Sequence, residues 1–322
     1  MRGVINMGGG KEPNEYLYID GKKVKLNPLR PTLESFLKPK TVEEVLTSNL
    51  NEANDRDVQL HNQHLEEITS IINDHIEGSV QIKLGGSVSK KTYVEGLSDV
   101  DVLLLLDKSE LSDKSPNEVK TYVAKVIENK LPGVKHIEVG KMAVTITFWD
   151  GTEIQLIPAV KSYTGYRIPN RTGKEWSHVV HPEKFAGKLT EINQSCGKNV
   201  IPVVKLVKKL NRNLEDRNDE SMSGYHIEAL AVQIFRNYPS DAPHTKTAML
   251  VYFLEHAKEA VLKPIKDKSG QSIHVDDYAG EANSSKRRFF SRELKQWAKD
   301  VQSAKDKNNP NYLPPAFLEV ER

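Results

Sequence analysis

The most informative part of the sequence is the stretch Leu84-Gly-Gly-Ser-Val-Ser-Lys-Lys-Thr-Tyr-Val-Glu-Gly-Leu-Ser-Asp-Val-Asp101. Gly85 and Gly86 follow a run of strand-forming residues, and because glycine has no side chain the backbone there can approach a phosphate closely. Ser87 adds a hydroxyl and an amide at the start of a predicted short helix, where the helix N-terminus favours anions. The turn therefore predicts a cradle in which Gly86 and Ser87 bind a phosphate group.

Two aspartates close the same stretch. Asp99 and Asp101 lie two residues apart on a predicted strand, so both side chains project from one face, about 7 Å apart along the chain. Paired carboxylates bind hard cations, and two such ions can hold the attacking and leaving oxygens of a phosphoryl transfer. Either signal alone is weak. Together, in the order strand, turn, helix, strand, they predict two Mg²⁺ ions at Asp99 and Asp101, with Mn²⁺ as an alternative.

The flanking sequence predicts an α+β lobe around this site, covering residues 41–165. Strand-forming runs recur at 80–84, 100–106, 136–139, 143–148 and 153–158, and Asp150-Gly151 predicts a tight turn between the last two. One amphipathic helix is predicted at 117–131. A long helix is predicted from the capping box of Thr41 and Glu44 to Ile76. Residues 1–40 are predicted to be an arm with a hairpin around Asp20-Gly21.

The rest of the chain predicts a second, helical lobe over residues 166–322. Helical patterns at 182–194, 200–211, 224–236, 245–262 and 285–304 are separated by clusters of Gly, Pro, Asn and Asp. The polar and then proline-rich tail from residue 305 onward is predicted to be a surface strap. The chain is thus expected to have two lobes behind its N-terminal arm.

The order of these elements resembles the DNA polymerase β-like nucleotidyltransferase superfamily, whose signature is G-[GS]-S followed by D-x-[DE]. The resemblance implies a mixed palm sheet with helices on one side, followed by a helical nucleotide-binding lobe. It also implies a third carboxylate on a later strand, within the pattern apolar-acid-apolar-apolar-Pro-Ala. Ile154-Gln-Leu-Ile-Pro-Ala159 matches that pattern, and Gln155 stands in the place of the acid.

Gln155 is the departure from the superfamily pattern with the largest chemical consequence, so we count it with Asp99 and Asp101 as a catalytic position. An amide cannot accept a proton from a ribose hydroxyl, and it is a poorer metal ligand than a carboxylate. Glu153 lies two residues earlier, a displacement of about 7 Å that argues against its replacing the acid. One hypothesis is that a parent chain carries glutamate here and that this chain has been made inert. A natural glutamine would instead imply a slow or purely nucleotide-binding homologue.

The same resemblance assigns roles in the helical lobe. Related families have a lysine-bearing helix followed by a Ser-[GSY]-Tyr-x-x-Glu element, in which the lysine and serine grip the triphosphate and the tyrosine stacks on the donor base. By motif position these roles pass to Lys205 or Lys208, to Ser223 and to Tyr225. Each has a structural alternative: a solvated lysine, a helix N-cap at Ser223, or packing between helices at Tyr225.

Within the superfamily, two further tracts resemble the bacterial relatives of cyclic GMP-AMP synthase. These are Tyr166-Arg-Ile-Pro-Asn170 with Trp176, and Val275-Asp-Asp-Tyr-Ala-Gly280. The resemblance implies an enzyme that joins nucleoside triphosphates, with ATP or dATP favoured, into a cyclic or short linear oligonucleotide. That product would be a second messenger of anti-phage defence that switches on an effector protein. The alternatives are a template-independent polymerase, making linear oligomers or adding CCA to tRNA, and a catalytically dead nucleotide sensor.

Composition restricts the remaining classes. The 322 residues carry 46 basic and 44 acidic side chains, a net charge of +2, which argues against strong binding of duplex nucleic acid. The longest apolar run, 102–106, is far below the roughly 20 residues that span a bilayer. The single cysteine, Cys196, excludes an internal disulfide and suits a reducing compartment. We therefore expect a cytoplasmic protein without membrane association.

Overall fold

The computed structural model describes the backbone of residues 16–19 and 22–25, and residues 40–54, 58–94, 100–170, 172–218, 220–267 and 273–318. The chain divides into two compact units, Met1–Thr41 and Val42–Arg322. In the first unit, β1 (Tyr16–Ile19) and β2 (Lys22–Lys25) pair in antiparallel fashion as the predicted hairpin.

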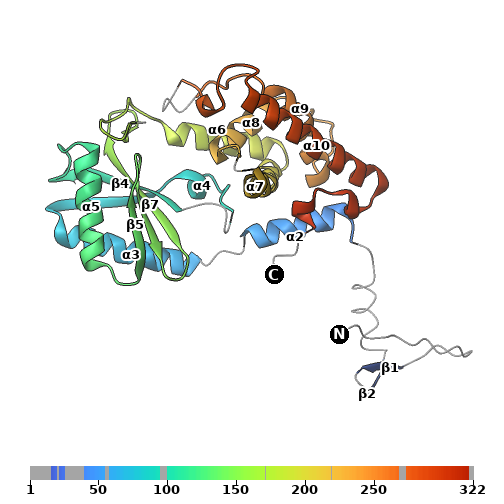
Figure 1. The fold of residues 1–322 in the computed structure, drawn as a ribbon, viewed down its shortest axis with the longest axis horizontal. Helices are drawn as coiled ribbons and strands as arrows, with labels where there is room; N and C mark the ends of the chain where they lie inside the picture. Colours follow the sequence, from blue (N-terminus) through green and yellow to red (C-terminus); the bar gives the residue numbers. More distant parts are fainter. Residues whose placement is uncertain are drawn as a thin grey trace, which may run out of the picture. The chain divides into compact units, whose positions relative to one another are not determined.

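A six-stranded mixed sheet is the centre of the α+β lobe (Figure 1). Its main strands are β3 (Gly78–Leu84), β4 (Val100–Ser109), β5 (Val134–Val139), β6 (Val144–Phe148) and β7 (Glu153–Lys161), in the order β3-β4-β7-β6-β5. The short β8 (Tyr166–Arg167) pairs with the end of β7. Hairpins join β5 to β6 and β6 to β7. The central strands β4 and β7 run parallel and are therefore not joined by a hairpin.

Alternation along β4 gives the sheet one apolar and one functional face. Val100, Val102 and Leu104 are buried in a core with α3 (Val58–His75) and α5 (Pro116–Lys130), which cover that face. Successive strand residues point to opposite faces, so Asp101 and Leu103 project from the other side. Helix α5 begins with the reciprocal capping box of Ser115 and Glu118. The helices thus leave the aspartate face of the sheet open for a site.

The helical lobe has its own apolar core. Helices α6 (Pro182–Ser195), α7 (Val200–Asn218), α8 (Gly224–Phe235), α9 (Lys246–Ala260) and α10 (Ser285–Lys307) surround it. The helical elements η1 (Asp277–Ala279), η2 (Pro310–Tyr312) and η3 (Pro315–Phe317) are short 3₁₀ turns, and the four-residue α4 (Gly86–Ser89) belongs to the sheet lobe. Figure 1 shows α4 lying between the sheet and α7.

The predicted long helix is divided in the structure. The apolar pattern from Thr41 to Ile76 gives two helices, α2 (Val42–Asn54) and α3, and residues 55–57 between them lie outside the described part of the chain. Helix α2 buries Val42, Leu46 and Leu50 in the core of the helical lobe, because its apolar stripe faces α7 and α9.

The tail is also not simply a surface strap. Its proline-rich part buries Leu313, Ala316 and Phe317 in the helical core. The Asn49 side chain of α2 donates a hydrogen bond to the Phe317 carbonyl at 3.1 Å, which ties the tail to that helix.

Candidate active site

Asp101 and Gln155 lie side by side at the open face of the sheet. The parallel register of β4 and β7 pairs Asp101 with Gln155 directly, and both side chains line the same cavity. Gln155 therefore occupies the position that the sequence pattern assigned to a third acid. Glu153, two residues earlier on β7, is not among the residues that line this cavity. Asp99, the other predicted metal ligand, lies outside the described residues.

The Gly85-Gly86 turn packs directly against the Asp101 side chain. The Gly85 amide donates a hydrogen bond to the Asp101 carbonyl at 2.8 Å. Gly86 has φ = +46°, and a Cβ placed on it would lie 1.6 Å from Asp101 Oδ2. No residue other than glycine fits this approach without moving the carboxylate. The glycine that the sequence assigned to a phosphate cradle is thus also what allows the turn to lie on the aspartate.

Ser87, the next residue, is buried at 8 % exposure. Its hydroxyl has no hydrogen-bond partner among the residues that the structure describes, although a buried hydroxyl ordinarily has one. The Ser87 carbonyl accepts the amide hydrogen of Thr92 at 2.9 Å, which closes the turn. A phosphate oxygen is the kind of partner that this buried hydroxyl would satisfy.

A cavity of about 460 Å³ opens between the sheet and the helical lobe. Of the predicted residues, it is lined by Gly86, Ser87, Asp101, Gln155, Lys208 and Tyr225. The walls combine apolar side chains, among them Leu103 and Ile157, with these polar groups, a composition typical of a small-molecule site. Six residues chosen from distant parts of the sequence are therefore brought to one cavity.

A buried charged cluster closes the helical side of the cavity. Glu228, 1 % exposed, lies 2.5 Å from Lys90 Nζ and 3.0 Å from Lys208 Nζ. Thr92 joins it, because its hydroxyl donates to Glu228 and its carbonyl accepts from Lys208 at 3.0 Å. Two ammonium groups against one carboxylate leave one formal positive charge in the cluster, a charge suited to phosphate.

Proton affinities in this cluster follow from burial and charge together. Burial acts to raise the pKa of Glu228, but the ammonium groups of Lys90 and Lys208 outweigh it and hold the pKa below its ordinary value. Burial lowers the pKa of Lys208, although Glu228 acts in the opposite direction. Glu228 is accordingly held as a carboxylate between two lysines.

An aromatic pair forms the next part of the wall. The rings of Tyr225 and Phe185 meet edge to face with centroids 4.8 Å apart, and Lys90 Nζ lies 5.2 Å from the Tyr225 ring centroid. The Tyr225 hydroxyl donates to Asp267 Oδ1 at 2.8 Å. Tyr225 is thus packed between helices and also lines the cavity, so the packing interpretation is confirmed and stacking on a donor base stays a prediction.

Two predicted residues lie elsewhere. Lys205 lines a separate hollow of about 190 Å³ with Lys91 and Tyr93, and its ammonium group donates to Asn54 Oδ1. Of the two lysine candidates, Lys208 is therefore the one at the cavity. Ser223 is the N-cap of α8, accepting the amide hydrogen of His226 at 3.2 Å, and is not among the cavity-lining residues.

Sequence reasoning missed Lys90, Thr92 and Phe185. Lys90 and Thr92 stand inside the quoted stretch, only three and five residues after Ser87, and their proximity to a phosphate turn was the available signal. Phe185 has no sequence signal, because only the packing of α6 on α8 brings it beside Tyr225.

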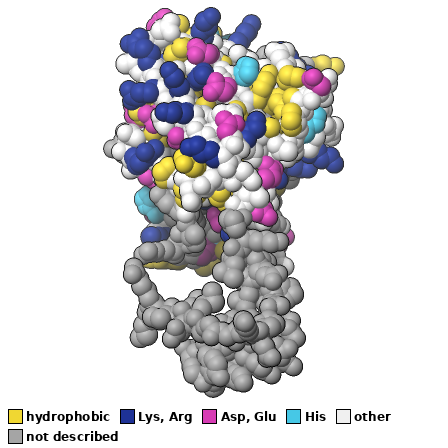
Figure 2. All heavy atoms as spheres, turned by 90° about the vertical axis from the view of Figure 1, so that its right-hand side faces the viewer, with side chains coloured by type: hydrophobic (Ala, Val, Ile, Leu, Met, Phe, Trp, Pro, Cys, Tyr) yellow, Lys and Arg dark blue, Asp and Glu magenta, His cyan; other side chains and the backbone are white. Residues whose placement is uncertain are grey.

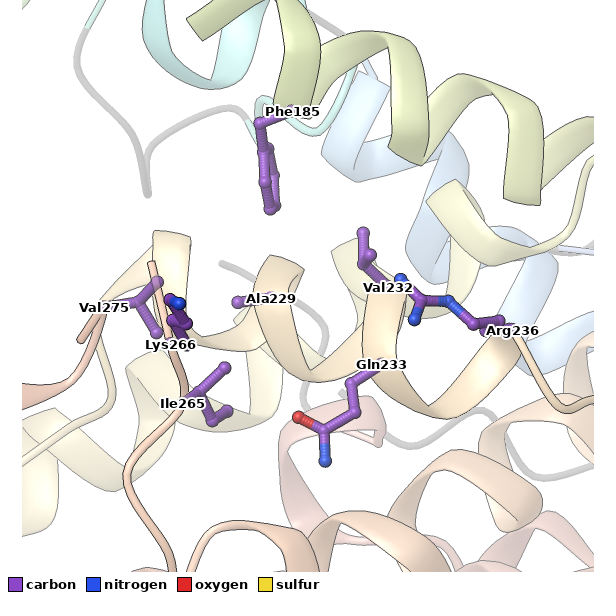
Figure 3. Close-up of a pocket in the computed structure, with 8 residues that line it drawn as sticks. All are labelled: Phe185, Ala229, Val232, Gln233, Arg236, Ile265, Lys266 and Val275. Atoms are coloured by element: carbon purple, nitrogen blue, oxygen red, sulfur yellow. The ribbon is translucent and has the colours of Figure 1, made fainter. Parts of the chain in front are cut away.

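A second, smaller cavity of about 130 Å³ adjoins the site behind Phe185 (Figure 3). Ala229 and Val232 of α8 and the segment carrying Ile265 and Val275 form its apolar walls. Figure 3 shows the Phe185 ring pointing from α6 into the space above α8. Phe185 therefore borders both hollows.

The donors around Asp101 suit a hard divalent cation. A carboxylate and an amide oxygen are the ligand types that Mg²⁺ takes, usually together with water and substrate phosphates. Within the described residues no cluster of three or more His, Cys, Asp or Glu side chains is placed to hold a metal ion.

No helix in the described part of the chain has the length and apolar character needed to cross a bilayer.

Comparison with known proteins identifies the catalytic lobe. Residues 41–193 match the Second Messenger Oligonucleotide or Dinucleotide Synthetase domain. A CCA-adding enzyme from Methanocaldococcus jannaschii is 23 % identical over 196 residues, which cover 59 % of this chain and 42 % of that enzyme. The chain thus spans less than half of this curated relative.

Solved structures share the fold at low sequence identity. CdnC from Escherichia coli MS115-1, determined with ATP, superposes with a TM-score of 0.61 at 14 % identity over 81 % of this chain and 89 % of that one. CdnG from Bradyrhizobium diazoefficiens, determined with GTP, gives 0.64 at 11 % identity over 86 % and 97 %. The cyclic AMP-GMP synthase DncV from Vibrio cholerae gives 0.56 at 11 % identity over 90 % and 87 %. The chain thus matches a second-messenger synthetase domain over residues 41–193, just under half of its length, and shares its fold with these solved structures.

Proposed function

We propose that this chain is a nucleotidyltransferase, which joins nucleoside triphosphates into a cyclic or short linear oligonucleotide that serves as a second messenger in anti-phage defence. The observation that carries the proposal is the pairing of Asp101 with Gln155 beneath Gly86, in a cavity that also holds Lys208 and Tyr225. A metal ligand, a phosphate turn, a cation and an aromatic ring thus converge as nucleotidyl transfer requires.

In the proposed reaction a ribose hydroxyl of one nucleotide attacks the α-phosphorus of another. A new oxygen–phosphorus bond forms, the bond from the α-phosphorus to the bridging oxygen breaks, and pyrophosphate leaves. Ser87 and the Lys90–Lys208 pair bind the triphosphate, and the Tyr225 ring supports the donor base. The proton of the attacking hydroxyl needs an acceptor, which the amide of Gln155 does not offer.

Magnesium fits this arrangement. Asp101 would hold Mg²⁺ together with Asp99 and with the amide oxygen of Gln155 as a weaker ligand, and Mn²⁺ would be the alternative. When bound, the ions neutralise charge that develops on the attacking and leaving oxygens. The protein's own part is to fix the Asp101 carboxylate, which the Gly86 turn does by lying against it.

Gln155 sets the expected rate. We infer that the chain binds nucleotide but turns it over slowly or not at all, since the place of the third acid holds an amide. The decisive experiment compares the chain with its Gln155→Glu variant on all four ribonucleoside and all four deoxyribonucleoside triphosphates, ATP and dATP first. Mass spectrometry identifies the products. We expect the variant to form a phosphatase-resistant oligonucleotide at least 100-fold faster.

A catalytically dead nucleotide sensor is the second candidate, favoured by the same amide. Calorimetry with Mg²⁺ and each triphosphate, run beside a pyrophosphate-release assay, separates the two functions. Tight binding without release, even after Gln155→Glu, would establish the sensor and contradict the synthetase. A ladder of linear products on a gel would instead indicate a template-independent polymerase, the activity class of the curated CCA-adding relative.

The surface argues against tRNA as that substrate. Figure 2 shows one face on which lysine and arginine side chains are numerous but acidic side chains lie among them. Such mixed charge, with a net charge of +2 for the whole chain, does not form the single-sign field of a nucleic-acid docking surface. We place the protein in the cytoplasm, where triphosphates are available, and expect an effector protein as the target of its product.

A further inference from the structure

A chain of buried polar groups connects α10 to the start of α8. Asp276 is fully buried at 0 % exposure, and so is Arg287 of α10, whose Nη1 lies 2.6 Å from Asp276 Oδ2. His226 of α8, also at 0 %, places Nε2 3.3 Å from the same oxygen. Taking these three groups out of water costs several kcal/mol per ion before their attraction is counted. Apolar side chains of similar volume would give a similar or greater free energy of unfolding. Stability alone therefore does not explain why charged groups are buried here.

The Asp276 carboxylate 3.3 Å from Nε2 favours the tautomer that carries the ring proton on Nε2. In that tautomer Nδ1 accepts a hydrogen bond from the Tyr278 hydroxyl, which lies 2.8 Å away. The same hydroxyl accepts the backbone amide hydrogen of Ser223 at 2.8 Å. Ser223 is the N-cap of α8, and the two residues after it, Gly224 and Tyr225, line the active-site cavity.

A second arm leads from Asp276 to the other end of Tyr225. Asp276 Oδ1 accepts the Ile265 amide hydrogen at 3.0 Å, and the Val275 amide donates to the Ile265 carbonyl at 2.9 Å. Two residues after Ile265 comes Asp267, 6 % exposed, whose carboxylate accepts the Tyr225 hydroxyl at 2.8 Å. Asp276 is therefore connected to the backbone of Tyr225 through Ser223, and to the Tyr225 hydroxyl through the segment from Ile265 to Asp267.

We propose that Asp276 is a positioning residue for nucleotide binding, which fixes the Tyr225 ring from both ends so that it presents one face to the cavity. This inference rests on the proposed role of Tyr225 as the support for the donor base. Asp276 does not touch that base and acts only through Ser223, His226 and Asp267. A ring fixed in advance costs less to order when the nucleotide binds, which strengthens affinity without adding a contact.

The test uses two variants and a neighbouring control. Asp276→Asn removes the charge at constant shape, but it leaves Arg287 uncompensated in the interior and endangers folding. Tyr278→Phe is the milder variant, since it removes one hydroxyl from the arm that holds Ser223. Asp277→Asn is the matched control, because the adjacent carboxylate lies 3.1 Å from His274, which is outside this network.

Two measurements follow Tyr225 itself. Fluorotyrosine incorporation gives a ¹⁹F resonance for Tyr225, assigned by its loss in Tyr225→Phe. Calorimetry with a non-hydrolysable ATP analogue and Mg²⁺ gives the Kd. We expect Tyr278→Phe to shift or broaden the resonance and to weaken binding about threefold to tenfold, the loss of one buried hydrogen bond. Asp277→Asn should change neither measurement.

The outcomes separate the two proposals. An unchanged Tyr225 resonance in a folded Tyr278→Phe protein overturns the positioning role, whatever the affinity. A shifted resonance with unchanged Kd also overturns it, because the ring then moves without consequence for the nucleotide. If the unaltered chain binds no nucleotide at all, the proposed function fails, and the positioning role fails with it. A purely structural role would lower the melting temperature of Tyr278→Phe while leaving Kd and the resonance of the folded protein unchanged.

Discussion

At the scale of single residues, Gly86 is the most constrained position of the site. Its positive φ and its contact with the Asp101 carboxylate each require glycine. We expect Gly86→Ala to displace the carboxylate by an ångström or more and to reduce nucleotide turnover by the Gln155→Glu protein about 100-fold, because misplacement on that scale has such an effect. Steady-state kinetics on the double variant measure this loss.

Gly151 supplies the control for that prediction. It also has a positive φ, +91°, but a Cβ there would meet nothing within 4 Å. Gly151→Ala should therefore cost about 1–2 kcal/mol of stability from backbone strain alone, with kinetics unchanged. Equal kinetic losses in both variants would show that strain, and not the clash with Asp101, explains the effect of Gly86→Ala.

Lys208 carries the second prediction at this scale. Lys208→Met leaves the buried carboxylate of Glu228 with Lys90 alone and removes the net positive charge that faces the cavity. We expect a loss of roughly 3–5 kcal/mol in the free energy of unfolding, as for a broken buried ion pair. Nucleotide affinity should fall as well, measured by calorimetry on the protein that remains folded.

Lys209→Met is the comparison for Lys208. It removes a lysine from the next position on α7, where Nζ lies 3.0 Å from Glu52 and the Glu52 side chain is 47 % exposed. A pair of this kind contributes about 0–1 kcal/mol. If the two variants were equally stable and bound nucleotide equally, the buried cluster would have no special role.

At the scale of elements, α6 and α8 set the aromatic wall. Phe185→Leu keeps an apolar side chain in the core but removes the edge-to-face contact with Tyr225, which is worth about 0.5–1.5 kcal/mol. We expect nucleotide Kd to rise severalfold, and the melting temperature to fall by about 2–4 °C because the contact also stabilises the core. Phe289→Leu on α10 is the matched change, since Phe289 packs on the helical core through Phe290 and does not line the cavity. A similar rise in Kd there would contradict the assignment.

Strands and helices were predictable from the sequence because their apolar periods are local. Alternation in 100–106 places the Asp101 and Val102 side chains on opposite faces of one strand. The Pro-Ala pattern after Gln155 identifies the neighbouring strand. The cluster of Lys90, Lys208 and Glu228 was not predictable, because it joins Lys90 to two residues that lie more than 100 positions further along the chain. The place of helix α2 was not predictable from local sequence either, because its stripe is as apolar as that of α3. Only tertiary packing assigns α2 to the core of the helical lobe and α3 to the core of the sheet.

At the scale of the whole molecule, the buried network of the helical lobe makes stability depend on pH. Burial lowers the pKa of His226 from its ordinary 6.5 to about 4. The Asp276 carboxylate acts to raise this pKa, and the Arg287 guanidinium acts to lower it. The remaining group that faces the ring is the neutral Tyr278 hydroxyl. Below pH 6.5 the imidazole is protonated in the unfolded chain but stays neutral in the folded chain. The contribution of His226 to the free energy of unfolding is therefore complete above pH 6.5 and is lost as the pH falls toward 4. Between pH 7 and pH 5 the loss should be about 2 kcal/mol. Denaturant unfolding at both pH values, compared with His226→Gln, isolates it: the variant should lose about 2 kcal/mol less than the parent. An equal loss in both proteins would mean that His226 is protonated without penalty in the folded state, and the hydrogen-bond direction assigned to its ring would then be wrong.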